Sequence, residues 1–258
     1  MKPILLFSAT SLALVALAPA VLIVNPPIAI DHVVQVQPII VQQAAAQGGA
    51  TATYFGTAGQ AAIIEAHVDT IWSQVGVDIE FLPSTTYVDS FAFNGFPTDY
   101  STAPRPLGDL NAINTAAGSP PKNSNPAVLN MFFVDIVPGF SFTSENTANG
   151  LAFVGGNGVT QFVGDNLLTF EAGREVIASV VAHEIGHNLG LPHLVEAENL
   201  MQEGGSPNPG ERLTAADRAT ILAVSGSAGT GLLQAIPEPS GVMFSLLGLA
   251  AFAMRRQR

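Results

Sequence analysis

The 258-residue sequence contains no cysteine, and only 11% of its residues are charged. The absence of cysteine excludes a disulfide-stabilised scaffold and any metal site with thiolate ligands. Nine lysines and arginines oppose twenty acidic residues, for a formal net charge of −11. A chain this acidic lacks the basic surface that neutralises phosphates, so no nucleic-acid partner is expected. Apolar residues make up 48% of the sequence, which excludes a disordered chain and supplies a core of ordinary size.

The first twenty residues are typical of a secretory signal peptide. Lys2 is the short positive start, residues 4–17 are mostly apolar, and Ala18 and Ala20 are small residues suited to cleavage. The alternative is an uncleaved anchor over residues 4–24, whose length is sufficient to span a bilayer. We predict a cleaved signal peptide at 1–20.

The C-terminal end has three parts in a fixed order: Pro-Glu-Pro at 237–239, an apolar run at 241–254 and three arginines among the last four residues. The run would be about 21 Å long as a helix, shorter than the ~30 Å hydrocarbon core of a bilayer. A plain tail anchor is therefore the weaker alternative. This order of parts resembles the PEP-CTERM sorting signal. The resemblance implies cleavage by an exosortase-like membrane enzyme, and export to the surface of a Gram-negative bacterium or beyond.

Between these ends, the sequence predicts a domain that contains both helices and strands. Amphipathic periodicity predicts a helix at 59–76, and alternation predicts a strand at 77–82. A buried strand is expected at 128–137. Further elements expected are short strands at 150–154 and 159–163 around a glycine-rich turn, and helices at 171–189 and 214–224. His67, at the border of the first helix's apolar stripe, is expected to be an ordinary histidine rather than a metal ligand.

Three other segments have weaker patterns. Residues 21–50 are expected to be a short pro-region, a linker or a first strand, and Pro38 would confine such a strand to a sheet edge. Residues 83–126 are rich in proline and loop-forming residues, and their oxygen-bearing side chains would suit a structural calcium ion, although no EF-hand spacing is present. The composition of residues 226–231 predicts a flexible linker.

Three of the five histidines fall within eleven consecutive residues, in the pattern HExxHxxGxxH. On a helix, His183 and His187 lie one turn apart on the same face, so both imidazoles can reach one ion. Glu184 lies beside them without having to bind the ion. Gly190 accepts the left-handed conformation that ends a helix, and the resulting turn brings His193 back as a third ligand. Three neutral nitrogens leave a fourth position for water, as in catalytic zinc sites.

These residues resemble the metzincin clan of zinc endopeptidases. Asn199-Leu200-Met201 matches the Met-turn, whose methionine sits beneath the three histidines. The HNLG string at 187–190 looks like reprolysins, whereas the interval from His193 to Met201 looks like matrixins. The resemblance covers about residues 51–225. It implies an α/β (α+β) catalytic domain with a mixed twisted sheet, a backing helix, an active-site helix, the Met-turn and a C-terminal helix.

The resemblance also implies a mechanism. Zinc would activate a water and polarise the scissile carbonyl, with Glu184 as the general base. An edge strand within 150–163 would pair with the extended substrate, and residues 202–212 would form the wall of the main specificity pocket. The sequence departs from the clan at Leu194, where several subfamilies have Ser, Glu or Asp, and at Gln202, because no Met-Tyr-Pro follows the turn. Without cysteine, a cysteine-switch propeptide is excluded, and the subfamily stays open.

The expected function is therefore an exported zinc-dependent endopeptidase that acts on protein or peptide substrates. The alternatives are a non-catalytic, zinc-stabilised surface or matrix protein, and a hydrolase of a non-protein amide in the cell envelope. The predicted organisation is a signal peptide at 1–20, a linker or pro-region at 21–50, the catalytic domain at 51–225, a flexible linker at 226–236 and the sorting tail at 237–258.

Overall fold

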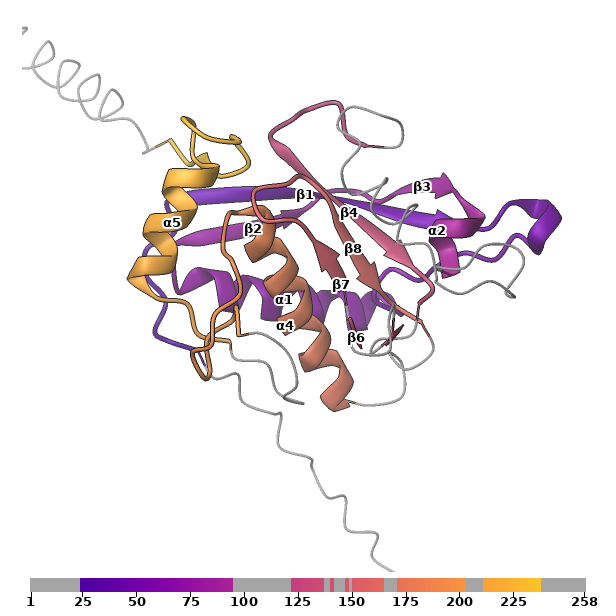
Figure 1. The fold of residues 1–258 in the computed structure, drawn as a ribbon, viewed down its shortest axis with the longest axis horizontal. Helices are drawn as coiled ribbons and strands as arrows, with labels where there is room; N and C mark the ends of the chain where they lie inside the picture. Colours follow the sequence, from indigo (N-terminus) through magenta and orange to yellow (C-terminus); the bar gives the residue numbers. More distant parts are fainter. Residues whose placement is uncertain are drawn as a thin grey trace, which may run out of the picture.

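The computed structural model describes residues 24–94, 122–136, 140–141, 147–148, 150–164, 171–202 and 211–237. Its main element is a twisted seven-stranded sheet whose path runs β2-β1-β4-β8-β7, while β3 and β9 also pair with β1 (Figure 1). The strands are β1 (His32–Gln42), β2 (Val77–Phe81), β3 (Thr85–Val88), β4 (Val128–Val134), β7 (Gly150–Ala152), β8 (Val159–Phe162) and β9 (Gln234–Ala235). A separate two-stranded sheet contains β5 (Phe140–Ser141) and β6 (Thr147–Ala148). The helices are α1 (Ala58–Ser73), α2 (Ser90–Asn94), α4 (Glu171–Asn188), α5 (Ala215–Ser225) and the short 3-10 helix η1 (Ala45–Gln47).

The sheet is mixed, as the sequence predicted. Strand β1 runs parallel to β2, β3 and β4, and β4 runs parallel to β8. Strand β7 is antiparallel to β8 and is the last strand of the path, and β9 is antiparallel to the start of β1. All seven residues of β4 are buried, which agrees with the apolar run that predicted this strand. The α/β fold class is confirmed.

Strand β1 decides among the three alternatives for residues 21–50, because residues 32–42 form a first strand. It is the first strand and lies at the centre of the sheet, so its residues form neither a linker nor a removable pro-region. The edge position expected from Pro38 is also wrong. On one side of β1 the partner changes from β2 (paired with 32–36) to β3 (paired with 39–42), and Pro38 falls between these two ladders. A proline is tolerated there because its missing N–H coincides with the gap between partners.

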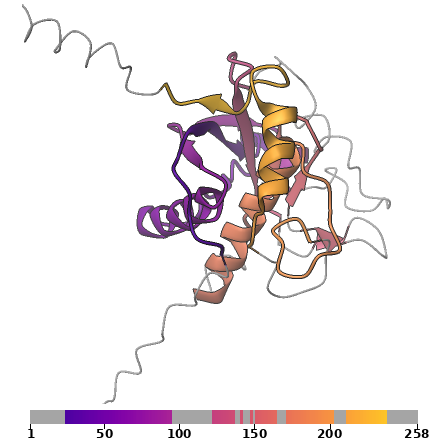
Figure 2. The ribbon, with the colours of Figure 1, turned by 90° about the vertical axis from the view of Figure 1, so that its left-hand side faces the viewer.

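Helices α1 and α4 pack against each other on the same side of the sheet (Figures 1 and 2). Helix α1 also contacts β2, and α4 contacts β7 and β8. The start of α1 is fixed by a capping box, in which the Thr57 hydroxyl accepts from the Gln60 N–H and the Gln60 side chain accepts from the Thr57 N–H. Gly76, at φ +72°, then turns the chain into β2. The predicted helix and strand are confirmed with small shifts of their ends.

The C-terminal part of the domain extends beyond the predicted boundary near residue 225. Helix α5 begins with the capping box expected from the sequence, Thr214 with Asp217. The following residues are not a flexible linker, because Leu232 and Leu233 are buried and β9 pairs with β1. The short glycine-rich stretch therefore belongs to a turn inside the domain. None of the helices in the described ranges has the length and hydropathy of a membrane span. The predicted signal peptide and nearly all of the sorting tail lie outside the described residues.

Candidate metal centre

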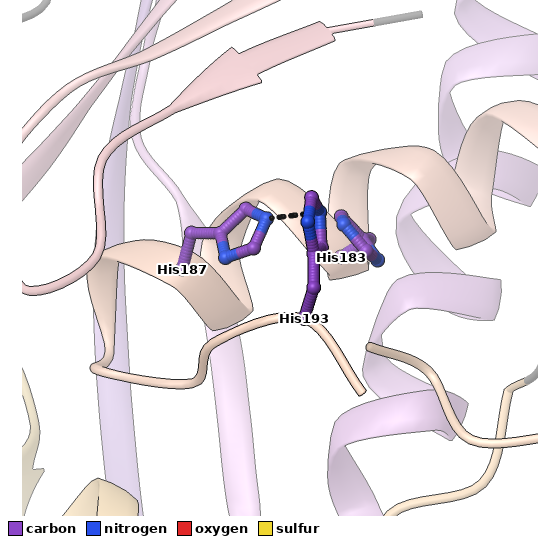
Figure 3. A group of neighbouring side chains, drawn as sticks. All are labelled: His183, His187 and His193. Carbon is purple, nitrogen blue, oxygen red and sulfur yellow. Dashed lines mark hydrogen bonds between the residues drawn. The ribbon is translucent and has the colours of Figure 1, made fainter. Parts of the chain in front are cut away.

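Helix α4 presents the first two histidines of the motif. Its apolar residues are buried in the core, which fixes the rotation of the helix about its own axis. His187 is 7% exposed and His183 is partly buried, one turn before it. Both side chains turn toward the same point, and His193 reaches that point from the loop that follows the helix (Figure 3). The structure thus brings together the three histidines that the sequence singled out.

The turn after α4 requires a glycine. Gly190 has a φ of +100°, and a Cβ at this position would lie 2.6 Å from Cβ of Val224 in α5. Both the left-handed backbone and the close approach of α5 therefore exclude a side chain here. Next, the Leu191 N–H donates to the Gly186 carbonyl at 2.9 Å, which closes the end of the helix. This turn places His193 opposite the two helical histidines.

The histidine nitrogens are spaced for one small cation. Each histidine offers a nitrogen within 4.8 Å of those of the other two, and Nε2 of His187 lies 3.1 Å from Nε2 of His193. Tetrahedral zinc with bonds of about 2.1 Å separates its ligand nitrogens by about 3.4 Å, so the distance between His187 and His193 is close to what zinc requires. Within the described ranges this is the only group of three or more metal-binding side chains that lie together.

Backbone carbonyls orient two of the rings. Nδ1 of His183 lies 2.6 Å from the Leu200 carbonyl oxygen, and Nδ1 of His187 lies 2.8 Å from that of Leu191. Because a carbonyl only accepts, each Nδ1 must carry the proton, and each Nε2 keeps its lone pair for a metal. Burial lowers the pKa of His183 to about 4, and burial also lowers the pKa of His187. Both rings are therefore neutral at pH 7, the form that binds metal.

Glu184 lies next to the histidines in a dry environment. Its side chain is 7% exposed, and burial raises the pKa of its carboxyl to about 8. The first residue of β7 packs directly against it: a Cβ on Gly150 would lie 2.9 Å from Cγ and Oε1 of Glu184. A glycine at this position therefore lets the edge strand approach the carboxyl group closely.

Met201 lies under the metal-binding part of α4. It is fully buried, and a Cβ on Gly186 would lie 2.6 Å from its sulfur, so the methionine packs directly on the helix backbone. The Leu194 N–H donates to the Met201 carbonyl at 2.8 Å, which links this turn to the residue after the third histidine. Met201 thus packs against the helix that carries the site, in the position that the resemblance implied.

Sequence reasoning missed the polar side chains that support the site. Oδ1 of Asn199 accepts the Met201 N–H at 2.8 Å, and its Nδ2 lies 3.4 Å from Oδ2 of Asp217. The same carboxylate accepts the Thr214 N–H at 2.7 Å in the capping box of α5. The capping pattern predicted the role of Asp217 within its own helix, but nothing in the sequence pairs it with a residue 18 positions earlier.

The remaining predictions about the site have mixed outcomes. His67 does not belong to the histidine group. Of the expected wall of the specificity pocket, residues 203–210 lie outside the described residues, while Gln202 forms a parallel bridge with Leu194. The described residues hold no second cluster of metal-binding side chains that bears on calcium, and most of the loop considered for it, residues 95–121, also lies outside them.

Comparison with known proteins supports this description of the site. A family model described as "Metallo-peptidase family M12B Reprolysin-like" matches residues 99–194, which include the three histidines and Glu184 and end before Met201. The match shows that this part of the chain is similar to metallopeptidases, and together with the group of three histidines it supports zinc as the metal. No curated protein matches the chain.

Several solved structures are similar to this chain at low sequence identity. Metalloproteinase-II from Bacteroides fragilis is 14% identical, with a TM-score of 0.44 over 78% of this chain and 55% of that one. The archaemetzincin of Methanopyrus kandleri is 14% identical, with a TM-score of 0.46 over 74% of this chain and 94% of that one. The archaemetzincin of Archaeoglobus fulgidus is 17% identical, with a TM-score of 0.40 over 73% of this chain and 99% of that one. The chain thus spans little more than half the length of the Bacteroides fragilis protein.

Proposed function

We propose that this protein is an exported zinc-dependent endopeptidase of the metzincin type that cleaves protein or peptide substrates. The observation that carries the proposal is the convergence of three imidazoles beside a buried glutamate, at the edge of a sheet. Such a set of ligands has the composition of a catalytic rather than a structural zinc site, because the described part of the chain supplies only three donors to the group.

His183, His187 and His193 would hold the zinc ion through their Nε2 atoms. For His183 and His187, the Nδ1 protons are held by carbonyl groups, so neither ring has to change its tautomer to bind. When bound, zinc supplies Lewis acidity toward a water molecule and toward the carbonyl of the scissile bond. The fit rests on the chemistry of the donors, since all of them are imidazole nitrogens and zinc accepts such ligands readily.

Glu184 would act as the general base and then as the general acid. It takes a proton from the attacking water and delivers it to the nitrogen of the leaving amine. Its buried position favours the protonated form in the absence of a cation, whereas a positive charge nearby favours the carboxylate that a base requires. The same burial keeps bulk water away from the proton that is transferred.

Strand β7 would bind the substrate backbone. It ends the sheet in the described part of the chain, and its first residue touches Glu184, so an extended peptide paired with β7 would run past the catalytic carboxyl group. Residues 202–212 would contribute the wall of the main specificity pocket. These assignments follow the metzincin resemblance and the position of β7 beside α4.

Export and processing complete the proposal. The signal peptide at 1–20 would direct the chain through the inner membrane, and an exosortase-like enzyme would process the tail at 237–258. The protein would then act at the cell surface or outside a Gram-negative cell. The sequence patterns of the two ends support this part of the proposal.

The decisive experiment combines metal analysis with a protease assay on the purified protein. We expect about one zinc per chain, digestion of casein, loss of digestion on addition of a chelator, and its return with zinc. Glu184→Ala should keep the zinc and lower the cleavage rate by about 10²- to 10⁴-fold. A Glu184→Ala variant that cleaves as fast as wild type would show that the base is assigned wrongly.

The same assay separates the alternatives. Zinc binding with zinc-dependent melting, but no cleavage of casein or of a peptide library, would identify a zinc-stabilised surface protein. Cleavage of muropeptides without cleavage of casein would identify a hydrolase of an envelope amide. Either result would refute the proposal of an endopeptidase.

A further inference from the structure

Asn188 is the last residue of α4, and its side chain is completely buried. It forms three hydrogen bonds with backbone groups of the turn between β7 and β8. Its Oδ1 accepts the Gly158 N–H at 2.6 Å, while its Nδ2 donates to the carbonyls of Gly158 at 3.1 Å and Phe153 at 3.3 Å. Only one orientation of the amide satisfies all three, because the oxygen faces a donor and the nitrogen faces two acceptors. Both Phe153 and Gly158 belong to the turn that joins β7 to β8.

The neighbouring metal ligand makes a fourth bond to the same turn. The Gly155 N–H donates to the His187 carbonyl at 2.8 Å. Two consecutive residues of α4, one of them a histidine of the metal centre, therefore hold the turn that follows β7. At the other end of β7, Gly150 packs against Glu184. The short edge strand is thus held at both ends by the helix that carries the site.

We propose that Asn188 is a positioning residue that fixes strand β7 relative to the metal centre, and thereby sets where an extended substrate places its scissile bond. The inference rests on the proposed function, since it assigns a role in presenting the substrate of that same site. A peptide bound along β7 follows any shift of the strand. Because His187 and Asn188 share one helix end, the strand cannot slide along α4 without breaking buried hydrogen bonds.

Two variants test the role of the amide. Asn188→Asp keeps the size and the acceptor for the Gly158 N–H, but it removes both donated bonds and places a carboxylate against two carbonyl oxygens. Asn188→Ala removes all three bonds. Gln37→Ala is the matched control: Gln37 is a buried amide whose partners are Pro38, Pro83 and Asn123, none of which lies in α4 or in the turn after β7.

The first readout is kinetic and uses the full-length protein with equal zinc content. The probes are a quenched fluorogenic octapeptide taken from a site that wild type cleaves in casein, and a tetrapeptide centred on the same bond. For both Asn188 variants, kcat/KM for the octapeptide should fall by about 10- to 100-fold, and clearly less for the tetrapeptide, which contacts less of β7. Gln37→Ala should lower neither value for the folded protein. If Asn188 had a purely structural role, kcat/KM would fall by the same factor for both peptides. That result would refute the proposal.

The second readout does not depend on activity. Hydrogen exchange of the Gly155 amide should accelerate in Asn188→Asp, because the turn loses its two other bonds to the side chain, and it should stay unchanged in Gln37→Ala. Should Asn188→Ala fail to fold, the isosteric Asn188→Asp decides the matter. A wild type that cleaves neither peptide would refute the proposed function, and the exchange data would still decide the positioning role. Unchanged exchange in Asn188→Asp would overturn it.

Discussion

The two long helices, α1 and α4, lie on the same side of the sheet and pack against each other, yet their buried side chains differ in polarity. All the buried residues of α1 are apolar: Ala61, Ile64, Val68, Ile71 and Trp72. Helix α4 buries an apolar ridge as well, but it also buries four polar side chains: Ser179, Glu184, His187 and Asn188. The fully buried side chains of α1 are therefore held by apolar contacts, whereas those of α4 include polar groups that depend on partners.

This difference separates folding from function within a single core. The buried side chains of α1 need no specific partner, so they tolerate changes that conserve volume. Those of α4 need carbonyls, amides and, in the proposed function, a cation. Two of the partners, Leu191 and Leu200, lie beyond the C-terminal end of the helix. We expect α1 to determine stability, and α4 to couple stability to the metal.

Removal of zinc should have the largest effect on stability and should act through α4. A ligand that binds only the folded state at a thousand times its Kd stabilises it by about 4 kcal/mol. We expect a chelator to lower the melting temperature of wild type and to leave that of His193→Ala unchanged, because the exposed His193 contributes a ligand but little packing. Val195→Ala, an exposed residue in the same loop, is the control and should respond like wild type. An equal response of His193→Ala and wild type would place the metal elsewhere.

Truncation of a buried side chain in α1 should have the next largest effect on stability, and it should leave catalysis and zinc binding unchanged. Ile64 is completely buried and its neighbour Ile63 is 44% exposed. Ile64→Ala should lower the free energy of unfolding by about 2–5 kcal/mol, and Ile63→Ala should change it much less. Urea denaturation measures both. Below its melting temperature, Ile64→Ala should retain the wild-type kcat and zinc content. A fall in kcat per folded molecule would show that α1 and the metal centre are not energetically separate.

The same distinction explains how far the sequence predicts the molecule. The pattern of apolar residues within one segment predicts α1, β4 and the apolar ridge of α4, because the buried face of each element is encoded in its own sequence. The histidine motif likewise predicts its own geometry, since a helix and a glycine turn determine it locally. Asn188 could not be assigned a role in this way. Its partners at 153 and 158 are 30 or more positions away, and an asparagine in a helix gives no signal of its own.

The wrong predictions concern segments whose structure depends on pairing with strands that are distant in the sequence. Residues 32–42 alternate only in part and contain Pro38, so local rules favoured an edge or a linker, whereas pairing on both sides makes this the central strand. The glycine content at the start of residues 226–236 predicts a flexible linker. In the structure, Leu232 and Leu233 are buried in the core, and β9, which follows them, pairs with β1 about 200 positions earlier. Pairing over such distances leaves no local pattern to detect.

The smallest expected effect concerns Asp69, a carboxylate that α1 partly buries. Oδ1 of Asp69 accepts the Ile79 N–H at 3.2 Å, and burial raises the pKa of Asp69 to about 6. Because this pKa is raised above its ordinary value, the contribution of the carboxyl to stability is present below about pH 4 and is lost as the pH rises through about 6. An asparagine side chain at this position would keep an oxygen for the Ile79 N–H without the charge.

Asp69→Asn should therefore unfold at higher urea concentration than wild type at pH 8, and the difference should shrink at pH 4. Glu196→Gln removes a charge from an exposed residue and serves as the control. A difference that is constant between pH 4 and pH 8, or a less stable Asp69→Asn at pH 8, would contradict the prediction. If the prediction holds, this partly buried carboxylate of α1 is dispensable for stability at neutral pH, whereas burial of the Glu184 carboxyl, which is 7% exposed, has a cost that its proposed catalytic role explains.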